Sequence, residues 1–299
     1  MSLIVVGSIA FDSVETPTGR ADDVLGGSAT YFAYAASYFT PVRLVGVVGQ
    51  DFPPAYRRLL ENRNIDMSGL ETAPGKTFRW RGAYESDMNT RRTLEVDLNV
   101  FGTFDPKLPG AFRDSKYVFL ANGSPAVQMK VLEQVASPAL VVADTMNLWI
   151  ETARDDLMTL LGKIDGLVLN DEEAVMLTET PNLVAAGRHV LAWGPTFVII
   201  KKGEHGAILV TSTDVISLPA FPTERVVDPT GAGDSFAGGV MGYLATQEAY
   251  HESHLRRAMA CGTVVASFNV EDFSLERFKV LDRSEIDRRL GLYQKMLAI

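Results

Sequence analysis

The chain of 299 residues is poor in cysteine and in positive charge. Its one cysteine, Cys261, cannot form an intrachain disulfide, so a reducing, cytoplasmic setting is the simplest expectation. Lys and Arg number 28 against 37 Asp and Glu, which gives a net charge of -9. A surface built for nucleic acid or anionic lipid needs an excess of positive charge, so we expect neither as a partner.

Long apolar runs and two common nucleotide-binding motifs are also missing. No stretch approaches the roughly 20 apolar residues that span a bilayer, and Met1-Ser2 leads into an apolar segment without a basic leader. We therefore expect no membrane association and no signal peptide. The chain has no Gly-x-x-x-x-Gly-Lys-Ser/Thr sequence, which argues against a P-loop enzyme. Its first strand-to-helix turn lacks Gly-x-Gly-x-x-Gly, which argues against a dinucleotide-dependent dehydrogenase.

What is present is a series of short apolar runs that alternate with helix-like, amphipathic segments. Apolar residues make up 46% of the chain, enough for a large core. Strands that alternate with helices predict an α/β fold with a mostly parallel central sheet covered on both faces. The runs predicted as strands are residues 3–6, 43–48, 117–120, 140–142, 166–169, 197–200 and 207–210.

One segment breaks this rhythm. Apolar and polar residues alternate with a period of two over residues 77–85 and again over residues 92–100, and residues 86–90 have the chemistry of a turn. This pattern predicts an antiparallel ribbon with one apolar and one polar face. Inserted into a parallel domain, the ribbon could be a lid or a dimerisation surface. An ordinary sheet edge is the alternative.

The most informative run is Asp-Pro-Thr-Gly-Ala-Gly-Asp at residues 228–234. It precedes an apolar helix that we expect to begin near Ala232, and the first amides of a helix form an anion site reinforced by the helix dipole. Asp234 would stand beside this site. A carboxylate there could accept the proton of an alcohol while the amides stabilise a phosphoryl group. The alternative is a glycine-rich turn with Asp234 as the helix N-cap.

This run resembles the C-terminal signature of the ribokinase and phosphofructokinase-B (PfkB) family of sugar and nucleoside kinases, residue for residue. Gly26-Gly27 resembles the family's di-glycine hinge, Asn170-Asp171-Glu172-Glu173 its Asn-x-x-Glu motif, and residues 201–206 its nucleotide-binding turn. The resemblance covers essentially the whole chain.

The resemblance implies a ribokinase-like fold in a single domain of residues 1–299. The small antiparallel β lid would be an insertion at approximately residues 76–101, with a contribution from residues 11–25 left open.

The resemblance also implies the reaction, a transfer of the γ-phosphate of ATP to a hydroxyl of a sugar or nucleoside. Asp234 would be the general base, and the amides of Gly231, Ala232 and Gly233 would hold the developing anion. The catalytic set is therefore these four residues.

On the nucleotide side, the resemblance implies that Asn170 and Glu173 organise Mg²⁺ and the ATP phosphates, with Glu173 reaching the metal through water. Lys201, Gly203 and Gly206 would lie along the nucleotide. Two structural alternatives stay open. Residues 170–173 could be an N-capped acidic first helical turn, and Lys201 could be a strand end whose side chain reaches for solvent.

On the acceptor side, the resemblance implies contacts from Asp12, from Gly26 and Gly27, and from Asn122. A carboxylate such as that of Asp12 can accept two hydrogen bonds from vicinal hydroxyls, as recognition of a sugar or ribose demands. Asp12 could instead be a plain turn residue.

Departures from the family pattern bear on the acceptor. Tyr31 stands where the sugar kinases often have an Asn, which weakens a simple pentose acceptor. An aromatic ring there, with Phe78 or Trp80 of the ribbon, could stack on a flat base and favours a nucleoside, although Tyr31 could also be core. The segment at residues 144–149 lacks the Arg of the family's Asp-Pro-Asn-x-Arg segment, which puts a phosphate contact from there in doubt.

We therefore predict an ATP- and Mg²⁺-dependent cytoplasmic kinase of an adenosine-like nucleoside or a sugar, with a K⁺ requirement near Asp228 and Thr230 left open. It would be a monomer or a homodimer formed through the ribbon. Two alternatives remain: a catalytically silent sensor of nucleotide or sugar, and a kinase of a vitamin alcohol on the same fold.

Overall fold

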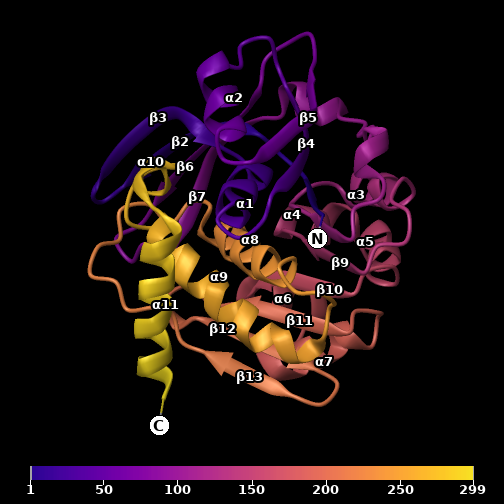
Figure 1. Cartoon of the computed structure of the whole chain (residues 1–299), viewed down its shortest axis with the longest axis vertical. Coiled ribbons are helices and arrows are strands. Elements are labelled where there is room, and N and C mark those ends of the chain that lie inside the picture. The colour runs from indigo at the N-terminus through magenta and orange to yellow at the C-terminus, as the bar shows by residue number, and fades with distance from the viewer. Residues whose placement is uncertain (1, 299) are drawn as a thin grey trace.

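The computed structural model describes residues 2–298 and contains a nine-stranded sheet, surrounding helices and a separate four-stranded sheet (Figure 1). The large sheet has the order β13-β12-β11-β10-β9-β8-β1-β4-β5. All neighbouring pairs from β11 to β5 are parallel, whereas β12 pairs antiparallel with both β11 and β13. The predicted α/β fold with a mostly parallel sheet is confirmed.

The strands of the large sheet follow the apolar runs of the sequence. Leu3–Val6 and Tyr117–Leu120 coincide with the predicted strands, because a strand buried on both faces reads as an unbroken apolar run. Two strands at the edges of the sheet were not predicted, β5 and β13, because both are half exposed and carry polar residues. The strands are β1 Leu3–Val6, β4 Val42–Val48, β5 Ile65–Thr72, β8 Tyr117–Leu120, β9 Leu140–Asp144, β10 Gly166–Asn170, β11 Phe197–Lys201, β12 Ala207–Thr211 and β13 Val215–Leu218.

Helices cover both faces of the sheet. Successive residues of β1 belong to different hydrophobic clusters, Leu3 and Val5 to one and Ile4 and Val6 to the other. The first cluster is closed by α1, α8, α9 and α11, the second by α3, α5, α6 and α7. No helix within residues 2–298 is long and apolar enough to cross a bilayer. The helices are α1 Ser28–Ala36, α2 Pro54–Glu61, α3 Pro125–Leu132, α4 Asn147–Thr152, α5 Arg154–Leu161, α6 Asp171–Thr178, α7 Leu183–Leu191, α8 Ala232–Leu244, α9 Leu255–Asn269, α10 Glu276–Val280 and α11 Arg283–Leu297.

The small sheet has the order β3-β2-β6-β7, and none of these described strands pairs with a strand of the large sheet. Its strands are β2 Ala10–Thr16, β3 Gly19–Gly26, β6 Phe78–Tyr84 and β7 Arg91–Asp97. The β6–β7 pair is antiparallel as the sequence pattern predicts, whereas β2 and β6 pair parallel. The second arm is shorter than predicted because the chain turns into a 3₁₀-helix at Asn99–Thr103.

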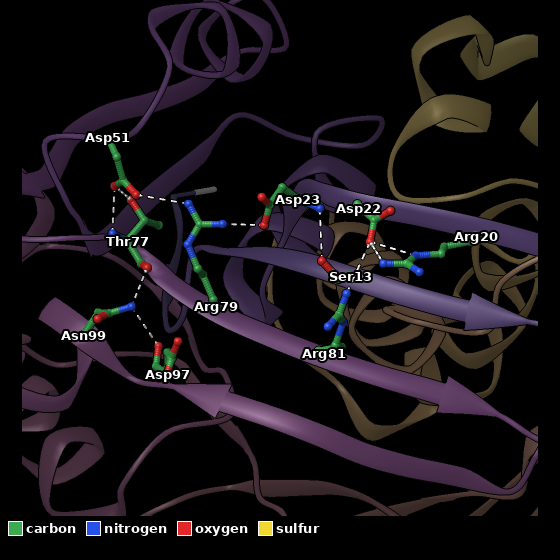
Figure 2. Close-up of polar contacts among 10 residues, drawn as sticks. All are labelled: Ser13, Arg20, Asp22, Asp23, Asp51, Thr77, Arg79, Arg81, Asp97 and Asn99. Carbon is green, nitrogen blue, oxygen red and sulfur yellow. Dashed lines mark hydrogen bonds and ion pairs between the residues drawn. The ribbon is translucent and has the colours of Figure 1, made fainter.

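A network of charged and polar side chains anchors the small sheet where β6 begins (Figure 2). The carboxylate of Asp51, which follows β4, accepts hydrogen bonds of 2.7 Å from both the amide and the hydroxyl of Thr77. Arg79 pairs with Asp23 of β3 and with Asp51, so it joins three segments that are distant in sequence. The polar face of the small sheet is thereby tied to the end of β4.

Candidate active site

The candidate site lies at the carboxyl edge of the large sheet. Asp144, Asn170 and Lys201 are the last residues of β9, β10 and β11, which are neighbours in the sheet. Because parallel strands end at the same edge, these three side chains come together there. Open α/β sheets bind their ligands at this edge. Helix α8 begins at the same edge, since Lys201 lies beside Gly233 of its first turn.

The first turn of α8 has a geometry that only glycine allows. The helix begins at Ala232, as predicted, after Gly231 in the left-handed conformation with φ 75°. A Cβ atom at Gly231 would lie 2.4 Å from the ring of Tyr31, so a side chain is excluded there on both counts. Asp234 is the third helical residue, and no side chain caps the helix, so the N-cap alternative is wrong.

The predicted anion hole is only partly present. The amide of Ala232 donates a hydrogen bond of 3.1 Å to the carbonyl of Pro229, which removes it from the predicted set of donors. The amides of Gly231 and Gly233 have no acceptor among residues 2–298. The prediction missed this difference because the turn before the helix closes on itself. Two unpaired amides remain at the positive end of a 13-residue helix.

Asp234 and Asp12 both have raised pKa values. Burial, with a contribution from Asp144, raises the pKa of Asp234 to about 7, against the opposing charges of Lys201 and Arg91. Burial and the charge of Asp228 raise the pKa of Asp12 to about 8. A carboxyl group with a pKa near 7 is suited to act as a general base at neutral pH.

Asp12 and the di-glycine are brought together, as the sequence predicts. Asp12 belongs to β2 and is only 4% exposed. A Cβ atom at Gly26 would lie 1.9 Å from Oδ2 of Asp12, so glycine is required for the carboxylate to occupy this place. Gly27 follows with φ 97° and starts α1. The charge of Asp234 also raises the pKa of Asp12, which places the two carboxyl groups in one electrostatic environment.

Tyr31 lies beside the site but not as expected. Its ring is 1% exposed and packs against Gly231, so it offers no face for a base to stack on, and the stacking role is not supported. Its hydroxyl is buried without a hydrogen-bond partner. Burial and the charges of Asp12, Asp228 and Asp234 raise its pKa well above the usual value.

Asn122 is turned toward other protein groups. Its Oδ1 accepts a hydrogen bond of 3.0 Å from the indole of Trp149, and its Nδ2 donates to the sulfur of Met146 at 3.1 Å. Both ends of the side-chain amide are therefore engaged by residues of and before α4. The contact of Asn122 with the sugar or nucleoside substrate stays a prediction.

Asn170 and Glu173 form a capping box at the start of α6, which is the structural alternative that the sequence left open. The Asn170 side chain accepts from the Glu173 amide, and the Glu173 carboxylate accepts from the Asn170 amide, each at 2.7 Å. Burial raises the pKa of Glu173 to about 7. Only Oε2 of Glu173 is used in the box, so its second oxygen is left for a water or a phosphate-bound cation.

Lys201 is buried rather than solvated. Its ammonium lies 3.6 Å from Oδ2 of Asp144, and the two side chains are 17% and 5% exposed. A Cβ atom at Gly233 would lie 3.0 Å from the same ammonium. Burial alone would lower the pKa of Lys201, but the charges of Asp144 and Glu173 outweigh it and raise the pKa. The alternative of a solvent-seeking side chain is wrong.

The nucleotide-binding turn predicted at residues 201–206 touches the small sheet. Gly206, with φ 86°, packs tightly, since a Cβ atom would lie 2.0 Å from the carbonyl oxygen of Leu218. A Cβ atom at Gly203 would lie 2.9 Å from Oδ1 of Asn89 in the β6–β7 turn, residues 85–90. Asn89 also donates to Glu204 at 3.3 Å.

Asp228 carries an unsatisfied oxygen. Its Oδ1 accepts from the amide of Thr230 at 2.8 Å, whereas Oδ2 is buried without a partner and burial raises the pKa to about 6. The hydroxyl of Thr230 contacts that of Tyr84 at 3.4 Å, so the small sheet also reaches the signature run. An orphaned carboxylate oxygen of this kind is a suitable ligand for a cation.

Sequence reasoning missed two charged residues of the site, Asp144 and Arg91. Asp144 ends a buried strand and opens the segment at residues 144–149 that resembles the family's Asp-Pro-Asn-x-Arg segment, so two signals were available. Arg91 is the first residue of β7, and its charge lowers the pKa values of Asp12, Glu173 and Asp234. No sequence pattern signals this role, because it depends on how the ribbon folds across the sheet.

Comparisons with known proteins agree with this arrangement. A sequence model described as "pfkB family carbohydrate kinase" matches residues 3–277. A cytidine kinase from Thermococcus kodakarensis is 30% identical over 246 residues, which are 81% of this chain and 87% of that protein. The predicted family resemblance is confirmed.

Solved structures share the fold. A nucleoside kinase from Burkholderia thailandensis in complex with ADP-inosine has a TM-score of 0.81 at 18% identity, covering 98% of this chain and 96% of that one. An aminoimidazole riboside kinase from Salmonella enterica, complexed with aminoimidazole riboside and an ATP analog, has a TM-score of 0.74 at 17% identity, covering 97% and 100%.

Proposed function

The chain belongs to the pfkB family of carbohydrate kinases, and within that family we propose that it transfers the γ-phosphoryl group of ATP to a hydroxyl of a nucleoside. The broader class, ATP-dependent phosphorylation of a nucleoside or sugar, was predicted from the sequence and is confirmed by the family and the related cytidine kinase. The nucleoside, the residue roles and the cofactors are the proposal.

One observation carries the assignment of Asp234 as the general base. Its carboxyl group, with a pKa of about 7, follows directly on the unpaired amides of Gly231 and Gly233 at the start of α8. In the proposed step, Asp234 takes the proton of the nucleoside hydroxyl, and the hydroxyl oxygen forms a bond to the γ-phosphorus of ATP. The bond from that phosphorus to the bridging oxygen breaks, and ADP leaves.

ATP and Mg²⁺ fit the residues at the helix mouth. The two unpaired amides, the helix dipole and the Lys201 ammonium suit phosphate oxygens, and the second oxygen of Glu173 suits a water of Mg²⁺. Within residues 2–298 no group of three or more His, Cys, Asp or Glu could hold a metal, so the ATP phosphates would supply most ligands. Bound Mg²⁺ supplies neutralisation of the triphosphate charge. We infer that K⁺ binds beside Thr230, with the unpaired Oδ2 of Asp228 as one of its ligands.

The proposal of a nucleoside rests on the small sheet, for which we infer the role of a lid over the acceptor. Asp12 pairs in register with Trp80, and Trp80 with Val96, so the three side chains share one face. Trp80 is partly exposed and Val96 is 49% exposed. A flat base that takes the place of the Arg91 guanidinium, which lies 5.6 Å from the centroid of the Trp80 ring, would stack on Trp80 while the ribose hydroxyls reach Asp12. The stacking role thus moves from Tyr31 to Trp80.

The quaternary state and setting remain part of the proposal. The residues Leu94, Val96 and Leu98 are 41–50% exposed and would be covered either by an acceptor or in a homodimer through the lid. The buried thiol of Cys261, whose pKa burial raises to about 12, favours no disulfide and agrees with a cytoplasmic setting.

The test is an acceptor screen read out as ADP release, with nucleosides and sugars side by side and Asp234→Asn as the matched variant. We expect release with at least one nucleoside, and a fall in turnover of roughly 10²–10⁴-fold in Asp234→Asn while ATP binding persists. Turnover of the variant at the wild-type rate would refute the base. Release with sugars but with no nucleoside would refute the acceptor class.

A further inference from the structure

A buried ion pair crosses the end of one strand of the large sheet. Asp144 ends β9 and Lys201 ends β11, and β10 lies between them. The lysine therefore reaches across Asn170 at the end of β10 to place its ammonium 3.6 Å from Oδ2 of Asp144. Because neighbouring strands lie about 4.8 Å apart, only a long side chain can close this gap.

The carboxylate of Asp144 is itself held in place. Its Oδ1 accepts a hydrogen bond of 2.9 Å from the amide of Thr145. Its carbonyl accepts one of 3.0 Å from the side chain of Gln128, which also binds the carbonyls of Leu120 and Ala121 at the end of β8. The acidic partner of the pair is thus fixed to the sheet by hydrogen bonds.

A buried ion pair is a weak way to stabilise a fold. Taking two charges out of water costs about as much as their attraction returns, and replacing such a pair by apolar residues is often neutral. The position of the pair points to another role. The Lys201 ammonium lies at the first turn of α8, where a Cβ atom at Gly233 would be 3.0 Å away.

The charges around Lys201 show what Asp144 changes. Three carboxyl groups raise the pKa of Lys201, those of Asp144, Glu173 and Asp234, and of these Asp144 is the one within 4 Å among the described residues. Without Asp144, the ammonium is left with Glu173 and with the base Asp234 as its partners. It would then be drawn toward the base instead of standing beside the incoming phosphate.

We propose that Asp144 is a positioning residue, which holds the Lys201 ammonium beside the first turn of α8 and away from Asp234. Lys201 then meets the oxygens of the transferred phosphoryl group, while Asp144 contacts neither substrate. This inference rests on the proposed function, because it needs a phosphoryl group at the helix mouth. No atom is transferred to or from Asp144 or Lys201 in the reaction.

The test compares the wild type with Asp144→Asn, Lys201→Met and the double variant, using the acceptor found in the screen. Asp144→Asn should lower kcat roughly 10–100-fold and leave the acceptor KM within about threefold, because the acceptor contacts are untouched. Each variant is measured on the plateau of its pH–rate profile, where Asp234 is ionised, because Asp144 and Lys201 both shift the pKa of this base. Lys201→Met and the double variant should then have the same kcat within about threefold, because Asp144 has nothing left to position.

The variant Asp165→Asn is the matched control. Asp165 accepts a hydrogen bond of 2.7 Å from the amide of Val141, at the opposite end of β9. Its substitution by Asn should therefore leave kcat unchanged. The proposal is overturned if Asp144→Asn turns over like the wild type, or if the double variant is more than threefold slower than Lys201→Met. Should Asp144→Asn fail to fold around an unpaired ammonium, Asp144→Glu replaces it in the cycle, since it keeps the negative charge and displaces the carboxylate by one methylene group. Wild-type turnover by Asp234→Asn would refute Asp234 as the general base, but it would not affect the comparison of the Asp144 and Lys201 variants.

Discussion

Asp234 stands among charges that move its pKa in opposite directions. Burial and the charge of Asp144 favour the protonated form, whereas Lys201 and Arg91 favour the ionised form. The balance leaves a pKa of about 7 instead of 3.8. A base of this kind is suited to a neutral cell, but its ionisation works against the folded state.

This opposition predicts a dependence of stability on pH. The unfolded chain ionises Asp234 near pH 3.8 and the folded chain near 7, so between these values the folded state binds more protons. The contribution of Asp234 to stability therefore falls as the pH rises through this window. Since one pKa unit is worth about 1.4 kcal/mol, Asp234→Asn should stabilise the protein by up to a few kcal/mol at pH 8. Thermal unfolding followed by circular dichroism should show an advantage that shrinks toward pH 4. An equal midpoint for both proteins at pH 8 would contradict the raised pKa.

At the scale of elements, two turns from distant parts of the chain meet over the site. The β6–β7 turn is held in shape by Asp87, which accepts hydrogen bonds from Asn89 and Thr90. Its Asn89 rests on Gly203 and Glu204 of the nucleotide-binding turn. Under the proposed function, closure of the small sheet over the acceptor and binding of ATP at residues 201–206 should therefore favour one another.

Asn89→Ala should weaken this coupling. In the wild type, we expect saturating ATP to lower the KM of the acceptor, and in the variant we expect this effect to shrink about two- to fivefold, as suits one exposed contact. The measurement is the acceptor KM at low and at saturating ATP. Glu204→Gln, which keeps an acceptor oxygen for Asn89, is the control and should behave like the wild type. A coupling factor that Asn89→Ala leaves intact would show that the two turns act independently.

At the scale of the whole molecule, the sequence predicts what depends on local pattern and misses what depends on folding across the chain. The parallel strands and the start of α8 at Ala232 follow from apolar runs and a glycine signature. The hydrogen bond of the Ala232 amide to Pro229 depends on the dihedral angles of one turn, and the effect of the Arg91 charge on the pKa of Asp234 depends on how the ribbon folds back. Neither feature can be predicted from the spacing of residues in the sequence.

The C-terminal helix α11, which runs along one side of the molecule, ties the end of the chain to the segment before the signature run (Figure 1). Glu271 pairs with Arg277 at 2.9 Å and with Arg289 of α11 at 2.6 Å. The Arg289 guanidinium stacks on Phe221, and the hydroxyl of Tyr293 donates to Pro219. One largely buried carboxylate thus holds two arginines and a whole helix in place.

Glu271→Gln should therefore destabilise the whole domain and not only its end. The glutamate is 13% exposed, as is Arg289, and breaking one partner of such a buried pair costs about 3–5 kcal/mol. Thermal unfolding should shift downward by roughly 10 °C, since 1 kcal/mol moves the midpoint about 2–4 °C in a domain of 150–250 residues. Asp287→Asn is the control, because its pairing with Arg283 at 2.9 Å lies on the exposed face of α11 and should contribute at most ~0.5 kcal/mol. Equal midpoints for the two variants would mean that α11 is held by its apolar face alone, and that the charges around Glu271 only cancel one another.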